Sequence, residues 1–137
     1  MIRIFGLLMM VWWSQVTAQD RWLHVSGVSW HDQPGFQQQN WGAGWETRTG
    51  NNWSVAVGAY RNSLDRTSVY GLAKYHWIKG DRWQVNINAG LVTGYRAMPV
   101  VPVVLPELCV TWVCALVIPR VGQNQATAAA VYLRIPW

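Results

Sequence analysis

The chain has 137 residues and a net charge of +5, and only 12% of its residues are charged whereas eleven are tryptophan. The length fits one domain, and so mild and dispersed a positive charge does not argue for nucleic acid as a partner. A soluble domain normally has about 25% charged residues, so this composition favours a membrane β-barrel over a secreted soluble barrel.

Residues 1–18 have the pattern of a cleavable signal peptide. Arg3 supplies the positive start, residues 4–13 form an apolar stretch, and residues 16–18 are a small-residue cleavage site. That stretch is too short to cross a bilayer as a helix, and no later stretch is long enough. We therefore expect an exported mature chain, residues 19–137, that folds as one barrel domain.

Turn signals divide the mature chain into eight extended segments. They lie near residues 21–30, 40–48, 52–61, 67–77, 82–93, 99–108, 111–118 and 127–136. The fifth has the clearest alternation, with apolar Trp83, Val85, Ile87, Ala89 and Leu91 on one side and Gln84, Asn86, Asn88 and Gly90 on the other. A period of two indicates strands with one apolar and one polar face.

The connections between these segments are alternately short and mostly longer, as in barrels with short periplasmic turns and longer outer loops. Aromatic residues cluster near the segment ends, and the chain ends on Trp137, which resembles the assembly signal of outer-membrane barrels. The sequence thus predicts an all-β fold, an eight-stranded antiparallel transmembrane β-barrel of the outer membrane.

Polar residues on the other face of the strands are expected to form a network inside the barrel, because a narrow interior excludes most water. The candidates are Glu46, Arg48, Lys74, His76, Gln84, Asn86, Asn88 and Arg134.

Cys109 and Cys114 flank a predicted tight turn, so a cross-strand disulfide is one interpretation. The interpretation that we favour is two small apolar residues near the barrel wall. No metal-ligand spacing is present, so we expect neither a metal nor another cofactor.

Residues that can act as bases, nucleophiles or anion ligands cluster in the predicted outer loops. No nucleophile-elbow, phosphate-loop or zinc motif occurs. His31 and Ser63 are a candidate base and a candidate nucleophile or hydrogen-bond partner. Arginines in the same loops are candidates for binding phosphate groups through charge-assisted hydrogen bonds, and the alternative is ordinary solvated charge. These arginines are Arg61, Arg66, Arg96 and Arg120.

Several short motifs in common order resemble the outer-membrane lipid A palmitoyltransferases, over about residues 28–137. They are Ser29-Trp-His31, Asn40-Trp-Gly-Ala-Gly44, Tyr60-Arg-Asn-Ser63, Ala89-Gly-Leu-Val-Thr93, Pro102-Val-Val-Leu-Pro106 and Val117-Ile-Pro119. The resemblance implies a small eight-stranded barrel that transfers an acyl chain from a phospholipid donor to lipid A, and we expect the barrel to be a monomer. It implies that His31 is the essential histidine, with Ser63 and Asn62 beside it.

Prolines donate no ladder hydrogen bond and are normally kept out of central strands. Pro102, Pro106 and Pro119 fall on two neighbouring strands, where weak pairing would give a lipid lateral access, as the resemblance implies. The alternative is that Pro102 and Pro119 merely start and end strands.

Asn62 stands where the family has an acidic residue, so we expect Asn62→Asp to increase a weak activity, with Asp32 or Asp65 as possible substitutes for the missing acid. His24 is a rival to His31. The alternative function is a non-enzymatic barrel that alters the cell surface or binds a partner through its loops.

Overall fold

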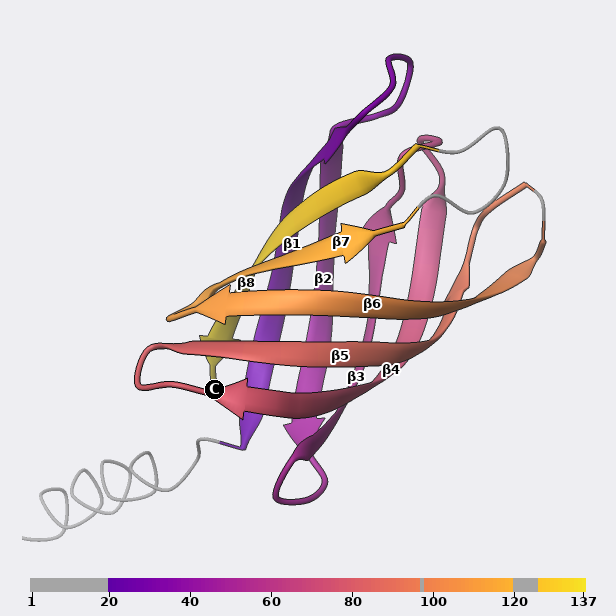
Figure 1. The fold of residues 1–137 in the computed structure, drawn as a ribbon. Coiled ribbons are helices and arrows are strands. Elements are labelled where there is room, and N and C mark those ends of the chain that lie inside the picture. Colours follow the sequence, from indigo (N-terminus) through magenta and orange to yellow (C-terminus); the bar gives the residue numbers. More distant parts are fainter. Residues whose placement is uncertain (1–19, 97, 120–125) are drawn as a thin grey trace, which may run out of the picture.

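The structure, a computed structural model, describes residues 20–96, 98–119 and 126–137. Eight antiparallel strands follow one another around a closed barrel (Figure 1). They are β1 (Arg21–His31), β2 (Gln39–Arg48), β3 (Trp53–Arg61), β4 (Thr67–Lys79), β5 (Trp83–Thr93), β6 (Val100–Val110), β7 (Val113–Ile118) and β8 (Ala128–Pro136). The predicted eight-stranded antiparallel barrel is confirmed. The predicted signal peptide, residues 1–18, lies outside the described residues.

The two ends of the barrel differ. The connections after β2, β4 and β6 are short turns and lie at the end where β1 begins and β8 ends, which we call the turn end. The strands β1, β3, β5 and β7 finish at the opposite end, which we call the loop end. In the described part of the chain, no helix is long and apolar enough to cross a membrane.

The side chains of the barrel are distributed in reverse to those of a soluble β-protein. In β5, Asn86 and Asn88 are buried inside, whereas Trp83 and Leu91 are 46% and 54% exposed on the outer surface. Most of the tryptophans near the ends of the predicted strands are also exposed: Trp30, Trp41, Trp53, Trp77, Trp83, Trp112 and Trp137. Trp22 is an exception, because it is buried and Arg134 lies 3.8 Å from the centre of its ring. The outer surface is therefore apolar and aromatic.

A β-bulge at Gly27 changes which residues of β1 face the interior. The register with both neighbouring strands shifts between Ser26 and Val28. His24, on the turn-end side of the bulge, is buried inside the barrel, and so is Ser29 on the other side, although strict alternation would point Ser29 outward. A bulge adds one residue to a strand and reverses the alternation beyond it. The bulge thus turns His31 inward and Trp30 outward.

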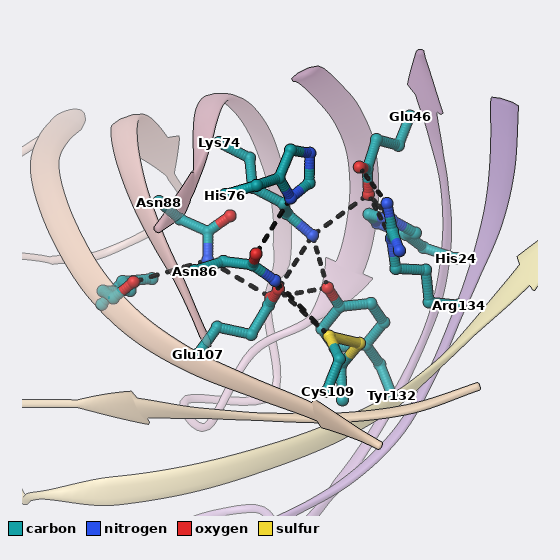
Figure 2. The surroundings of a disulfide bond; sticks show 12 residues. His24, Glu46, Lys74, His76, Asn86, Asn88, Glu107, Cys109, Tyr132 and Arg134 are labelled. Carbon is teal, nitrogen blue, oxygen red and sulfur yellow. Dashed lines mark hydrogen bonds and ion pairs between the residues drawn. A yellow bond between two sulfur atoms is a disulfide. The ribbon is translucent and has the colours of Figure 1, made fainter. Parts of the chain in front are cut away.

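Ion pairs fill the turn-end half of the interior (Figure 2). Lys74 Nζ lies 3.0 Å from Glu46 Oε2, 2.9 Å from Glu107 Oε1 and 2.9 Å from the Tyr132 hydroxyl. The Arg134 guanidinium donates hydrogen bonds of 2.9 and 2.7 Å to the two oxygens of Glu46. Two buried carboxylates are therefore matched by two buried cations, which is the condition under which buried charge is tolerated.

Amide and imidazole groups complete this network. Asn86 Nδ2 donates to Glu107 Oε1 over 2.8 Å, Asn88 Nδ2 donates to Glu107 Oε2 over 3.2 Å, and His24 Nε2 lies 2.8 Å from Glu46 Oε2. Of the predicted network residues, Glu46, Lys74, His76, Asn86, Asn88 and Arg134 belong to it. Arg48 does not, because it is exposed and pairs with Asp20. Gln84 is only half-buried, and its Nε2 atom has no hydrogen-bond partner in the described part of the chain.

Cys109 and Cys114 form a disulfide between β6 and β7 and are almost fully buried. The favoured interpretation of two unlinked cysteines was therefore wrong. The two residues are direct cross-strand partners, with Cα atoms 4.0 Å apart, and this pairing brings their side chains together on the interior face.

Candidate functional site

A cavity lies between the ion-pair network and the loop end. It contains about 850 Å³ of space not occupied by protein atoms, its open mouth included. Most of its surface is apolar, and the aliphatic side chains in its walls include Leu72, Val92, Leu105, Leu116 and Ile118. Lys74, Glu107 and Tyr132 of the network form its floor. The cavity is therefore an apolar space with a polar floor, and apolar clefts with a few polar groups are the usual form of a ligand site.

Tyr70 lies against one wall of this cavity because two glycines make room for it. A Cβ atom at Gly44 or at Gly58 would collide with the Tyr70 hydroxyl. Gly44 and Gly58 are direct partners in the β2–β3 ladder, so together they form one shallow recess in the wall. This explains the two glycines by the close approach of a side chain to the backbone.

His31 and Ser63 both line the mouth of the cavity. The two residues that the sequence predicted as base and nucleophile therefore line one cavity, although they are 32 positions apart. The His31 ring stacks on Phe36, with ring centres 5.0 Å apart, and its buried Nδ1 atom has no hydrogen-bond partner among the residues that the structure describes. Within the described residues, no hydrogen bond joins His31 to Ser63. His24, the rival histidine, lies deeper and is bound to Glu46.

Asn62 is fully buried, and its side-chain hydrogen bonds join the connection between β3 and β4 to β4 and to the connection after β5. Its Nδ2 atom donates to Ser68 Oγ over 2.9 Å and to the Gly94 carbonyl over 3.0 Å. Its Oδ1 atom accepts from the backbone N–H groups of Leu64 and Arg66. Asn62 thus shapes the loop that carries Ser63, and it has no hydrogen bond to His31.

The two acidic residues that were considered as substitutes have other partners. Asp32 Oδ1 accepts a 3.0 Å hydrogen bond from the Thr127 backbone N–H. Asp65 Oδ1 accepts a 2.8 Å hydrogen bond from Arg61 Nε. Neither carboxylate is bonded to His31, so the described residues give this histidine no acidic partner.

The predicted arginines Arg61, Arg66 and Arg96 are exposed at the loop end. Arg61 is already engaged with Asp65, an exposed pair of the kind that contributes little to stability. Arg66 is exposed and next in sequence to this pair. Arg120 lies outside the described residues.

Sequence reasoning missed two polar pairs near the mouth. The hydroxyls of Tyr60 and Tyr95 lie 3.0 Å apart, and both residues line the cavity. Burial raises the pKa of Tyr95 well above its usual value, so its hydroxyl is neutral at physiological pH. Ser29 donates to Asn40 Oδ1, and Asn40 Nδ2 donates to the Arg61 carbonyl. Ser29 could not be assigned to the interior from the sequence, because the bulge at Gly27 reverses the alternation of β1.

The wall beside the cavity is weakly paired between β6 and β7. β6 forms eleven pairs with β5 but only four with β7, from Glu107↔Leu116 to Val110↔Val113. Among the described residues, residues 100–106 of β6 have no ladder partner in β7. We call this side of residues 100–106 the unpaired β6 edge. In Figure 1, β6 and β7 lie together near their shared turn and diverge away from it.

Pro102 and Pro106 lie on this edge, and Pro119 follows β7. The Thr111 backbone N–H donates to the Arg82 carbonyl, on the β5 side. Because successive N–H groups of a strand point to opposite edges, the even-numbered residues of β6 direct theirs toward β7. At positions 102 and 106 the N–H is missing, so the two prolines leave the β5 ladder intact and remove donors from the edge that faces β7.

Comparison with known proteins adds no identification. No protein-family model matches the chain, and no curated protein matches it either.

Proposed function

We propose that the protein is an outer-membrane enzyme that transfers an acyl chain from a phospholipid to lipid A or a similar lipid. The observation that carries this proposal is an apolar cavity with His31 and Ser63 at its mouth and a weakly paired wall at its side. Leu105 of β6 and Leu116 of β7 line this cavity, so a lipid chain that passed the unpaired β6 edge would arrive among aliphatic side chains.

The membrane location is supported by the reversed distribution of side chains. Closed barrels cross membranes with apolar residues outside and polar residues inside. The exposed tryptophans near the strand ends suit the two interfaces of a bilayer. With the predicted signal peptide, these features favour the outer membrane, with the loop end on the cell surface.

In the proposed reaction, a hydroxyl of the acceptor attacks the ester carbonyl of the donor. His31 accepts the proton of that hydroxyl while the bond from oxygen to the acyl carbon forms. The carbon–oxygen bond to the lysophospholipid then breaks, and the leaving oxygen takes the proton back from His31. Ser63 hydrogen-bonds to the reacting groups or acts as a transient nucleophile. The exposed arginines Arg61, Arg66 and Arg96 bind acceptor phosphates.

A second function, a non-enzymatic barrel that alters the cell surface or binds a partner through its loops, is favoured by a specific observation. Within the described residues, no carboxylate is hydrogen-bonded to His31, because Asp32 and Asp65 bind elsewhere and Asn62 holds its own loop. Under the enzymatic proposal, the same observation implies slow transfer.

Two measurements test the proposal. Mass spectrometry of lipid A, from cells with the protein and cells with its His31→Ala variant, should show one added acyl chain only with the unaltered protein. Purified barrel in vesicles of phospholipid and lipid A should transfer an acyl chain slowly, with less transfer by Ser63→Ala and none by His31→Ala. Folded protein that transfers nothing in either setting makes the non-enzymatic function the better explanation. Recovery of the protein as a soluble periplasmic species would end the membrane proposal.

A further inference from the structure

Few backbone hydrogen bonds hold the β6–β7 seam, by which we mean the four pairs from Glu107↔Leu116 to Val110↔Val113. Hydrogen-bonded and non-hydrogen-bonded pairs alternate in an antiparallel ladder. Val110↔Val113 flanks the two-residue turn and is of the hydrogen-bonded kind, and the next of that kind is Leu108↔Ala115. The one after that falls on Pro106, which has no N–H. The seam therefore has two hydrogen-bonded pairs and then ends.

The disulfide lies between these two pairs. Cys109↔Cys114 is the intervening, non-hydrogen-bonded pair, where opposite side chains approach most closely. Cys109 is 2% exposed and Cys114 is 0% exposed, and they pack with Tyr132 inside the barrel. The covalent bond thus lies in the middle of the short seam, on its interior side.

The ion-pair network holds β6 but not β7. Glu107, at the loop-end limit of the seam, bonds to Lys74 of β4, to Asn86 and Asn88 of β5 and to Tyr132 of β8. Within the described residues, none of the network's hydrogen bonds or ion pairs ends on a β7 side chain. Apart from two backbone pairs and apolar packing, the disulfide is what joins β7 to β6.

We propose that the Cys109–Cys114 disulfide is a covalent clamp that fixes where the separation of β6 from β7 ends. With the bond in place, the separation stops at Glu107 and Leu116. Without it, the two remaining pairs open readily and the separation extends to the turn at residues 111–112. This property belongs to the barrel wall and does not depend on the acyl-transfer proposal.

Hydrogen exchange of the mature barrel, folded in detergent micelles, tests the clamp. In the double variant Cys109→Ala/Cys114→Ala, the backbone amides of Leu108 and Ala115 should exchange hydrogen at least about tenfold faster than in the unaltered protein. Amides in the β3–β4 ladder should stay within about twofold. The matched control is Val92→Ala, which removes a buried side chain of the same cavity far from the seam and should leave seam exchange unchanged. Equal seam exchange in the double variant, or equal acceleration by Val92→Ala, overturns the clamp.

A second measurement serves if the double variant does not assemble. Folded, unaltered protein is reduced with a phosphine and alkylated, and mass spectrometry counts the alkylated thiols. Amide hydrogen exchange is compared before and after the reduction. Two alkylated thiols after reduction, together with faster exchange confined to the seam, support the proposal. Two alkylated thiols in the untreated protein, or no change in seam exchange after complete reduction, overturn it.

Discussion

Glu107 and Tyr132 form a 2.6 Å hydrogen bond between β6 and β8, two strands that are not neighbours in the barrel. The bond runs inside the barrel from β6 to β8 and so bypasses β7, the strand between them. Glu107 also belongs to the last pair of the β6–β7 seam. The Tyr132 hydroxyl donates to Glu107 and also accepts from Lys74, so it satisfies two charged groups of the network.

Tyr132→Phe removes this hydroxyl without changing the ring. The variant should lose about 1–3 kcal/mol of unfolding free energy, because a buried carboxylate and a buried ammonium each lose a partner. Denaturant titration in detergent micelles measures the loss. Tyr75→Phe is the control, since the Tyr75 ring packs on Trp53 and its hydroxyl has no hydrogen bond in the described part of the chain. An equal effect of both substitutions would contradict the structural role of Tyr132.

Deleting Gly27 should reverse the direction of the residues beyond it in β1. His31 would then point outward and Trp30 inward, while the strands stay paired. A cysteine that replaces His31 should react with a lipid-soluble maleimide only in the deletion background. In a separate variant that keeps His31, deleting Gly27 should abolish acyl transfer. Gly27→Ala is the control and should change little, because an added Cβ would meet only Trp41, at 3.9 Å. A cysteine at position 31 that reacts equally in both backgrounds would count against the role of the bulge.

Replacing Pro106 with Ala supplies the N–H that the next hydrogen-bonded pair of the seam lacks. Pairing with Val117 should then lengthen the seam, so stability should stay level or rise, while acyl transfer falls at least about tenfold, an effect worth about 1.4 kcal/mol in the barrier. Adding Pro102→Ala and Pro119→Ala should strengthen the effect. Pro34→Ala, in the exposed connection after β1, is the control. Unchanged transfer in the triple variant would remove lateral access from the proposal.

Asn62→Asp should destabilise the protein by about 1–3 kcal/mol and should not increase transfer. The Nδ2 atom of Asn62 donates to the Gly94 carbonyl, and a carboxylate oxygen there would face another oxygen. This reverses the expectation drawn from the sequence, which treated Asn62 as a neighbour of His31. Thermal unfolding and a transfer assay on the same sample separate the two effects, and Asp65→Asn controls for a charge change in the same exposed loop. A stable, more active Asn62→Asp would restore the original expectation.

The fold could be predicted from the sequence because period-two alternation depends on local residue types, as in β5. Glu107 could not be assigned to the network so easily, since it stands alone among Val104, Leu105, Leu108 and Val110. Only its pairing with Asn86 across the β5–β6 ladder reveals that it faces inward. The bulge at Gly27 was equally hidden, because one added residue leaves no compositional signal, yet it decides the direction of His31. The partners of Asn62, Asp32 and Asp65 depend on loop geometry, which alternation does not address.

The ion-pair network obstructs the interior of the barrel on the turn-end side of the cavity. A solute entering at the loop end would have to separate buried charges before it reached the turn end, at a cost of about 3–5 kcal/mol for each pair left without its partner. This cost opposes the passage of a solute along the whole interior of the barrel. Whatever occupies the cavity must leave by the mouth or through the wall, so the residence time of an occupant is set at the loop end and along β6.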